Sequence, residues 1–250
     1  MKNFRNSFLK FISKYDEWFL RKINLVDTPF EILFSEKHKL YIHLIENDIR
    51  LESLHSDFFQ TISLFCFEHN IKLIHLREEQ WLEKSDFIKH RLNSIFESNL
   101  KIHPRQCKIR RIDKVEYDTF LNQNHLLQTA KTKFKYGLFK KEELVGVMGI
   151  SGGRWMTKEN DLRRSYEMIR FATKSNTTVV GGFSKLMKHI EEELEVQEWM
   201  SYFDLDWVVS NVYTKMGFQI KEIQKPKKIE LNSYCTYTSG NLKLIKRING

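Results

Sequence analysis

The sequence predicts an α/β protein with two domains, residues 1–103 and 104–250. Short apolar patterns typical of strands alternate with helical patterns along the whole chain. The order of these patterns changes after the connector around Pro104, which indicates a domain boundary there. With 250 residues, of which 41% are hydrophobic, the chain is long enough for two hydrophobic cores.

The first domain is predicted to be a small α/β domain that opens with an amphipathic helix. Phe4, Phe8 and Phe11 follow helical spacing, and Asp27-Thr28-Pro29 ends the pattern. The strand at 71–76 is apolar throughout, as expected for a central strand. In order, the expected elements are a helix over 3–26, a hairpin of strands 30–34 and 40–45, a helix over 53–70, the strand 71–76 and a helix over 81–96.

The second domain is predicted to form a mixed sheet with flanking helices. Its first helix begins after Asp113, a suitable N-cap residue with Glu116 at the third helical position. In order, we expect a strand over 107–112, a helix over 114–127, a hairpin of strands 136–140 and 144–150, a strand from Tyr166, a glycine turn, a helix from Phe183, a strand over 198–203, a helix over 210–216, a strand over 218–223, and final strands near 234–237 and 242–246.

The glycine turn is a candidate phosphate site. Val179-Val180 meets Gly181-Gly182 just before the helix, which leaves unhindered backbone amides at a helix N-terminus. The N–H groups of the first turn have no partner inside the helix, and the helix dipole is positive there. The alternative is an ordinary strand-to-helix turn in which the glycines only relieve crowding.

Charge favours a polyanionic partner. Lys and Arg exceed Asp and Glu by 41 − 32 = 9, and the basic residues cluster at 101–111, 131–141 and 221–228. Nucleic acid is therefore the expected partner, and charge alone does not distinguish DNA from RNA. We expect no membrane partner and a cytoplasmic location, since no long apolar run or signal peptide is evident. The 3 cysteines have no spacing typical of a metal site, and the oligomeric state is left open.

The order of elements over residues 107–223 resembles the GNAT acyltransferase fold. The short helix ending in Asn211-x-Tyr213-x-x-x-Gly217-Phe218 belongs to this resemblance. It implies that the amides of the glycine turn hold the pyrophosphate of acetyl-coenzyme A or another acyl donor, and that Tyr213 protonates the departing thiolate. The turn lacks the family's usual Q/R-x-x-G-x-G/A pattern. The donor-binding residues that the resemblance nominates are Val180, Gly181, Gly182, Phe183, Ser184 and the adjacent Lys185.

A closer resemblance is to GNAT-like domains of the Mom DNA-modification type found in phages and mobile elements. Six phrases occur in a fixed order: Asn124-His125, Tyr136-Gly-Leu138, Glu143-Leu-Val-Gly-Val-Met148, Tyr166-Glu167 with Arg170-Phe171, Gly181-Gly182 with Ser184-Lys-Leu186, and Ser201-Tyr202 with Asp204 and Trp207. The resemblance implies modification of an adenine amine in DNA. Asp204, which lies on the last phrase, is the candidate base that takes a proton from the attacking amine. Asp206 is the weaker candidate, and a loop acid or helix cap is the alternative role for either.

Further residues are candidates for the acceptor side of the cleft. Arg170 interrupts an apolar strand, so it needs either an acidic partner or an anionic ligand. Trp155 and Trp207 could stack on an extruded base, and core packing is the alternative for each. His125 and Tyr136 are further catalytic candidates, and the remaining substrate-binding candidates are Asn124, Ser151 and Arg154.

The first domain is similar to the very-short-patch-repair members of the PD-(D/E)XK nuclease class, as found in phage homing endonucleases. Pro29-Phe30-Glu31 opens the first strand, and Glu79-Gln80-Trp81 follows the third. In the second strand His43 stands where a metal-binding carboxylate is expected, and Glu46 lies at the strand's end. The resemblance therefore implies a degenerate nuclease-like domain that holds DNA.

Three functions follow from these patterns. The first is a GNAT-like transferase that modifies a nucleobase amine, with no metal. The second is a Mg²⁺-dependent homing or restriction-type endonuclease in which Glu31, Glu46 and Glu52 bind the metal. The third is a DNA-binding protein without catalysis.

Overall fold

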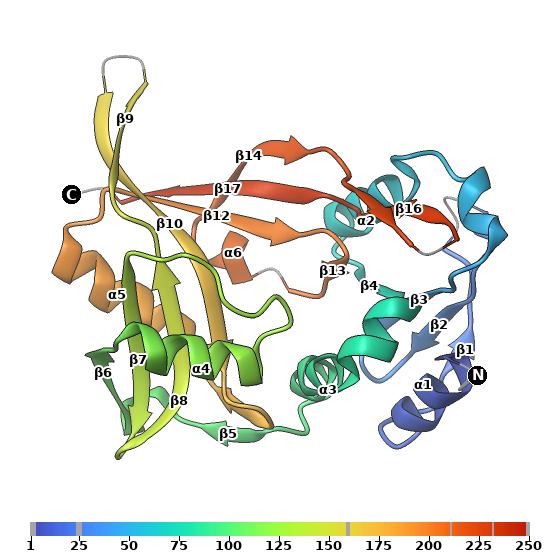
Figure 1. Cartoon of the computed structure of the whole chain (residues 1–250), viewed down its shortest axis with the longest axis horizontal. Helices are drawn as coiled ribbons and strands as arrows, with labels where there is room; N and C mark the ends of the chain where they lie inside the picture. Colours follow the sequence, from blue (N-terminus) through green and yellow to red (C-terminus); the bar gives the residue numbers. More distant parts are fainter. Residues whose placement is uncertain (1–3, 24–26, 159–160, 211, 232, 249–250) are drawn as a thin grey trace. The chain divides into compact units, whose positions relative to one another are not determined.

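The structure is a computed structural model that describes residues 4–23, 27–158, 161–210, 212–231 and 233–248. Helices flank mixed sheets along the chain, which confirms the predicted α/β class (Figure 1). None of the helices in these residues is both long and apolar enough to cross a membrane.

The chain divides into two compact units, and neither unit is a continuous stretch of sequence. Unit 1 comprises Met1–Ile88, Tyr202–Lys215 and Ile220–Lys243, and unit 2 comprises Lys89–Ser201, Met216–Gln219 and Leu244–Gly250. These bounds differ from the two continuous domains expected from the sequence, because residues of the C-terminal third belong to both units.

Unit 1 contains a five-stranded sheet in the order β1-β2-β3-β4-β13. The central strands β3 and β4 are parallel and almost entirely buried, in keeping with the apolar pattern at 71–76. The strands are β1 (Phe19–Leu20), β2 (Ile32–Ser35), β3 (Leu40–Ile45), β4 (Lys72–Arg77) and β13 (Trp207–Val208). A separate hairpin pairs β15 (Lys228–Glu230) with β16 (Cys235–Tyr237). The helices are α1 (Phe4–Ile12), η1 (Ile49–Ser53), α2 (Phe58–Glu68) and α6 (Val212–Lys215), and α3 (Glu78–Ile95) begins in this unit.

The first helix is much shorter than the helix predicted over 3–26. Phe4, Phe8, Phe11 and Ile12 form its buried face, as the spacing predicted. The indole Nε1 of Trp18 donates a hydrogen bond to the carbonyl oxygen of Ile12 at 3.2 Å. This bond satisfies one of the carbonyls that a helix end leaves without a partner, so the chain turns away while later aromatic residues still follow helical spacing.

Unit 2 is organised by a mixed sheet in the order β14-β17-β12-β10-β8-β7-β6, and β9 also pairs with β10. Its strands are β6 (Cys107–Arg111), β7 (Phe134–Lys140), β8 (Glu143–Ile150), β9 (Arg154–Lys158), β10 (Asp161–Thr173), β12 (Glu198–Asp204), β14 (Gln219–Gln224) and β17 (Asn241–Arg247). The chains of β12, β14 and β17 each pass from one unit into the other. Strands β5 (Leu100–Ile102) and β11 (Thr177–Val179) pair separately, and the helices are η2 (Pro104–Gln106), α4 (Lys114–Asn124) and α5 (Gly182–Leu194).

The elements of residues 107–223 follow the order that the GNAT resemblance implies. The β7–β8 hairpin is antiparallel, while β10 and β12 are parallel and pair over Ser165–Glu167 and Glu198–Met200. The predicted N-cap of α4 is confirmed, because the Asp113 carboxylate accepts a hydrogen bond from the backbone N–H of Glu116 at 2.8 Å. The β9 strand was not predicted.

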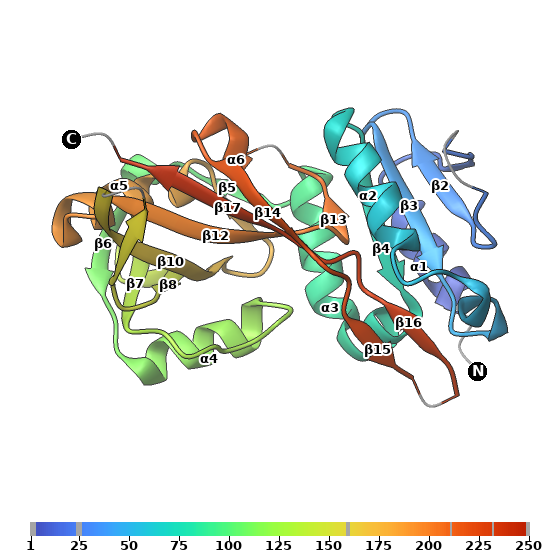
Figure 2. The same ribbon diagram turned by 90° about the horizontal axis from the view of Figure 1, so that it is seen from above.

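Helices α4 and α5 cover opposite faces of the β7–β8–β10 part of the sheet (Figure 2). A Cβ atom at Gly149 would lie 1.8 Å from the hydroxyl of Tyr117 on α4, so α4 occupies the side to which Gly149 faces. On the other side, the ring of Tyr136 contacts His189 of α5 at 6.0 Å between ring centroids. Adjacent residues of a strand point to opposite faces. Each predicted site residue on these strands can therefore be assigned to the face of the sheet that α4 covers or to the face that α5 covers.

Candidate functional site

The glycine turn lies at the N-terminus of α5, as predicted. Gly181 has a φ of 74°, a left-handed conformation that favours glycine, and no side chain caps the helix. Gly182 is required for packing, because a Cβ atom there would lie 2.9 Å from Val179 and 3.0 Å from Leu138. Val180 is 49% exposed and Ser184 is exposed as well. The turn therefore combines a positive helix end with an open backbone, the two properties that bind an anion.

Three of the nominated donor-binding side chains, those of Lys185, Phe183 and Ser184, have contacts with neighbouring residues. The Lys185 ammonium donates hydrogen bonds to the carbonyl oxygens of Pro104 at 2.9 Å and Cys107 at 2.5 Å. Phe183 packs edge-on against Phe171, with ring centroids 5.2 Å apart. Lys185 thus ties α5 to η2 and β6. The Ser184 hydroxyl donates a hydrogen bond to the Met216 sulfur at 3.6 Å, so the backbone amides are the groups that remain directed at the turn's surface.

Tyr136 lies on the α5 face, in a cluster with charged neighbours. Its ring is fully buried beneath Arg111, whose guanidinium pairs with Glu193 of α5 at 2.5 Å. Burial, together with the negative charge of Glu193, raises the pKa of Tyr136 to about 12. The phenol is therefore protonated at neutral pH and can act as a hydrogen-bond or proton donor, but not as a base.

Asn124, His125 and Arg170 form a separate group on the α4 face. The Asn124 amide oxygen accepts a hydrogen bond from Ser175 N–H at 2.7 Å, which fixes the end of α4 to the turn after β10. Burial, together with the charges of Arg170 and Arg91, lowers the pKa of His125 to about 4. His125 is therefore neutral at pH 7. The structure brings it together with Arg170 but places it on the opposite face of the sheet from Tyr136.

Ser151, Arg154 and Trp155 follow β8 into the β9–β10 hairpin. Ser151 has a structural contact, since its hydroxyl accepts a hydrogen bond from Glu167 N–H at 2.8 Å. The hairpin projects from the sheet (Figure 1), and Trp155 is 63% exposed opposite Arg164. Core packing, the alternative for Trp155, does not account for an indole with this exposure, and stacking on a base stays a prediction.

The remaining predicted residues of the transferase site belong to unit 1. The Asp204 carboxylate accepts a hydrogen bond from the Asp206 N–H at 2.9 Å, which closes the turn after β12. Tyr213 in α6 packs edge-on against Phe203, with centroids 6.2 Å apart. Trp207 is only 2% exposed and belongs to the core, so its indole is not available for stacking on a base. Trp207 is packed in the core because its strand, β13, pairs with β4 in the sheet.

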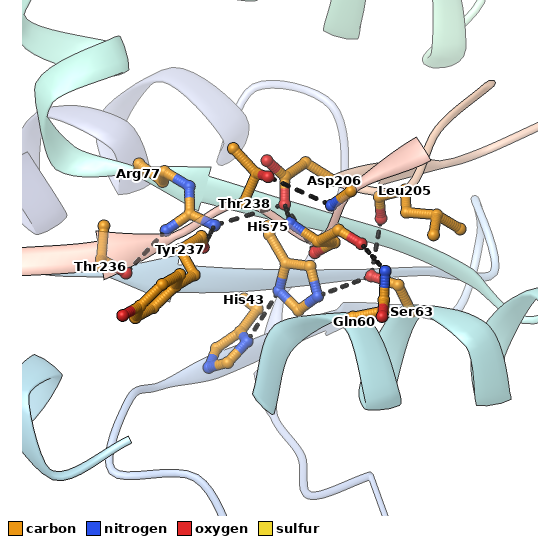
Figure 3. Close-up of polar contacts among 12 residues, drawn as sticks. His43, Gln60, Ser63, His75, Arg77, Leu205, Asp206, Thr236, Tyr237 and Thr238 are labelled. Carbon is orange, nitrogen blue, oxygen red and sulfur yellow. Dashed lines mark hydrogen bonds and ion pairs between the residues drawn. The ribbon is translucent and has the colours of Figure 1, made fainter. Parts of the chain in front are cut away.

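Asp206 is committed to a buried ion pair. Its carboxylate accepts hydrogen bonds from the backbone N–H and the hydroxyl of Ser239 and lies 3.3 Å from the guanidinium of Arg77 (Figure 3). The Arg77 side chain is fully buried and also donates to the Tyr237 carbonyl at 2.7 Å. These contacts give Asp206 a structural role, in line with its weaker standing as a base.

The residues of the nuclease alternative do not converge on a metal site. Glu31 pairs with Arg5 at 2.6 Å, and Glu46 pairs with Arg50 at 2.5 Å. Glu52 lies exposed in η1. In the part of the chain that the structure describes, no three His, Cys, Asp or Glu side chains are grouped so as to hold a metal ion. The observed contacts do not favour the Mg²⁺-dependent endonuclease.

A buried histidine pair occupies the core of unit 1 instead (Figure 3). His43 Nδ1 lies 3.0 Å from His75 Nδ1, and His75 Nε2 lies 3.0 Å from the Ser63 hydroxyl. Ser63 donates to the Leu205 carbonyl at 2.6 Å, so it accepts from His75 Nε2–H. His75 Nδ1 then accepts from His43 Nδ1–H, and His43 Nε2 accepts from the Thr28 hydroxyl at 2.8 Å. Every member of the chain has a partner with both histidines neutral.

This histidine chain was missed from the sequence because two residues 32 positions apart meet only through the parallel pairing of β3 and β4. The available signal was a histidine in each of two apolar strands. Buried polar side chains in such strands need hydrogen-bond partners, and each of the two histidines is a partner of the other.

The sequence matches no model of a known protein family, and no curated protein matches it. Among solved structures it is similar to an acetyl-coenzyme A-bound GNAT family acetyltransferase from Elizabethkingia anophelis, with 14% identity, a TM-score of 0.36, and coverage of 57% of this chain and 99% of the other. It is also similar to the ribosomal-protein-S18-alanine N-acetyltransferase from Escherichia coli, with 11% identity, a TM-score of 0.40, and coverage of 58% and 95%. An acetyltransferase from Bacillus subtilis in complex with coenzyme A has 16% identity, a TM-score of 0.35, and coverage of 57% and 99%. These values are too low to assign a family or an activity.

Proposed function

We propose that this chain is a GNAT-like group transferase that modifies a nucleobase amine, of the adenine N6 type, in DNA. The observation that carries the proposal is the α5 turn in its place within the sheet. An uncapped helix N-terminus, opened by a left-handed Gly181, follows strands β10 and β11 in an element order that resembles that of an acyltransferase. The phosphates of an acyl donor are the ligand that this turn fits.

The turn fits phosphate through its backbone. The first-turn amides of Gly182, Phe183 and Ser184 have no capping side chain. No basic side chain of the turn is free for the donor, since the Lys185 ammonium is bonded to carbonyls. A bound acyl thioester supplies the group that is transferred. We expect its affinity to rest on amides more than on ion pairing.

The resemblance to GNAT-like domains implies that Asp204 takes the proton that the attacking amine loses as its nitrogen bonds to the acyl carbon. It likewise implies that Tyr213 gives a proton to the sulfur whose bond to that carbon breaks. Both residues belong to unit 1. His125 lies on the opposite face of the sheet from Tyr136 and has no role in this step, and the buried Tyr136 stays protonated and available for hydrogen bonding.

The β9–β10 hairpin supports nucleic acid as the acceptor. Trp155, Met156 and Leu162 are each more than half exposed on it, and Arg154 and Arg164 are exposed beside them. Aromatic and basic side chains on a projecting two-stranded ribbon suit base stacking and phosphate contact. The chain's net charge of +9 acts in the same direction.

Donor binding is tested by isothermal titration of the full chain with coenzyme A. Ser184→Glu places a negative charge at the helix end, where it competes with a phosphate, and we expect a loss of binding of about tenfold or more. Ser184→Gln is the matched control, because it adds similar bulk without charge. Equal coenzyme A binding by the wild type and Ser184→Glu would show that the turn is not the donor site.

The acceptor is tested by mass spectrometry of nucleosides from DNA of cells that express the protein. We expect an adduct on adenine that disappears in Asp204→Ala and persists in Asp118→Ala, a matched loss of an acidic side chain on α4. Unmodified DNA together with normal coenzyme A binding would retain the transferase and reject DNA as its acceptor.

A further inference from the structure

The α4 face of the sheet carries two cations side by side without a carboxylate partner. Lys135 of β7 and Arg170 of β10 are both paired with Gly149, which lies between them on β8. All three positions therefore face the same side of the sheet. Both cations are half-buried, and no carboxylate of the described residues lies within ion-pair distance of either. Glu167 acts on Arg170 only at longer range.

The donors of these cations are largely unused. Arg170 donates from Nε to the Gln128 carbonyl at 3.4 Å and from Nη1 to the Ile169 carbonyl at 2.8 Å. A guanidinium has five N–H donors, so Nη2 and part of Nη1 are left over. Lys135 donates to the Thr132 carbonyl at 3.1 Å and has two further donors. Burial lowers the pKa of Arg170, as expected for a charge that lacks compensation.

Two buried hydroxyl groups lie near the same glycine. A Cβ atom at Gly149 would meet the Tyr117 hydroxyl at 1.8 Å and the Thr132 methyl group at 2.8 Å. The two hydroxyls interact with each other, and neither has another hydrogen-bond partner among the described residues, so at least one of the two O–H donors is left without an acceptor. The Tyr117 ring is fully buried in the core with Phe120 and Leu121. A hydroxyl left unsatisfied in such a place is costly, and it lowers stability unless a ligand accepts its hydrogen bond.

We propose that this cluster, the Gly149 site, binds the oxyanion of a phosphate group through Arg170, Lys135, Tyr117 and Thr132. Each of the four side chains can donate a hydrogen bond to an oxyanion. The negative charge of the oxyanion also compensates the positive charges of Arg170 and Lys135. To bind the Arg170 guanidinium, the phosphate competes with the long hydrogen bond that Nε donates to the carbonyl oxygen of Gln128. The site lies on the opposite face of the sheet from the α5 turn, so it goes beyond the donor site of the proposed transferase. The phosphate could be free or part of a nucleic-acid backbone.

The test is the melting temperature of the full chain against inorganic phosphate, with sodium chloride used to keep the ionic strength constant. We expect phosphate to raise the wild-type melting temperature by about 3–6 °C at ten times its dissociation constant. The rise should be lost in Arg170→Gln and reduced in Tyr117→Phe. Ser184→Glu, which blocks the α5 turn, should keep it, so failure of this site is distinguishable from failure of the donor site.

Tyr117→Phe keeps the proposal falsifiable if Arg170→Gln does not fold. If the Tyr117 hydroxyl has no ligand, its removal leaves the phosphate response unchanged and stabilises the protein, because an unsatisfied group is gone. That result, or a wild-type response no larger than the chloride control, overturns the site. Weaker oligonucleotide binding by Arg170→Gln would identify a backbone phosphate as the ligand, and unchanged oligonucleotide binding with a lost phosphate response would identify free phosphate.

Discussion

At the scale of single residues, the buried histidines of unit 1 show how position sets protonation. Burial is the main cause that lowers the pKa of His75 to about 3 and holds that of His43 well below its usual value. Arg77, whose guanidinium is also buried nearby, adds to both effects. Neutral rings are what the hydrogen-bond chain from Thr28 to Leu205 requires.

We therefore expect stability to fall as the pH drops below about 6.5. The unfolded chain then takes up a proton on each histidine while the folded protein does not, and this favours unfolding down to the depressed folded pKa. The loss approaches about 1.4 kcal/mol per pH unit for each buried histidine. The free energy of unfolding from urea denaturation between pH 7.5 and 5 measures it.

An exposed histidine provides the control for this pH dependence. His55→Gln should leave the slope unchanged, because His55 is solvent-exposed. His43→Gln should lower the overall stability but flatten the slope, since one titrating group is removed. A slope that is the same in all three proteins would show that the buried pair does not control acid stability.

At the scale of elements, two left-handed glycines differ in what surrounds them. Gly217 has a φ of 84° and open space where a Cβ atom would lie. Gly240 has a φ of 76°, and its Cβ atom would lie 2.3 Å from the Gln224 carbonyl oxygen. That carbonyl also accepts a hydrogen bond from the Gln60 amide at 2.8 Å, so it is not free to move.

Alanine at these glycines should separate backbone strain from crowding. Gly217→Ala should lower the free energy of unfolding by about 1–2 kcal/mol, because alanine is strained in the left-handed conformation. Gly240→Ala adds a steric clash with a fixed carbonyl, a further cost of about 1–3 kcal/mol. Urea denaturation of both variants gives the comparison, and a Gly240→Ala variant no less stable than Gly217→Ala would contradict the packing described around Gln60.

Most of the elements that the sequence predicted have at least one buried face, although the exposed β14 was predicted as well. The β7–β8 hairpin, α4 with its Asp113 cap, and the buried β4 all follow from apolar spacing. The β9 strand does not, because both faces of a projecting ribbon are exposed and Trp155 faces no core that would impose alternation. Side-chain contacts, such as the hydrogen bonds of Lys185 to two carbonyl oxygens, depend on which elements pack together in the fold. The local sequence pattern does not give this information.

At the scale of the whole molecule, positive charge is the property most relevant to a nucleic-acid partner. The net charge of +9 arises from 41 basic and 32 acidic residues. Many surface cations are already paired within the protein, as Arg110 is with Glu142 and Lys174 is with Glu143. Surface pairs of this kind are weak and leave the long-range field of the chain positive. Cations such as Arg154, which has no ion-pair partner among the described residues, are the ones best placed to contact phosphates.

The salt dependence of oligonucleotide binding should therefore report on Arg154 and Trp155 differently. Removing one phosphate contact with Arg154→Gln should lower the slope of log affinity against log salt by about 1. Trp155→Ala should weaken binding by about 1–3 kcal/mol at every salt concentration without changing the slope, because stacking releases no counterions. Lys22→Gln is the control, since its ammonium already pairs with Asp27 at 3.1 Å. Fluorescence anisotropy at several salt concentrations measures all four proteins, and an unchanged affinity in Trp155→Ala would exclude the hairpin from the nucleic-acid interface.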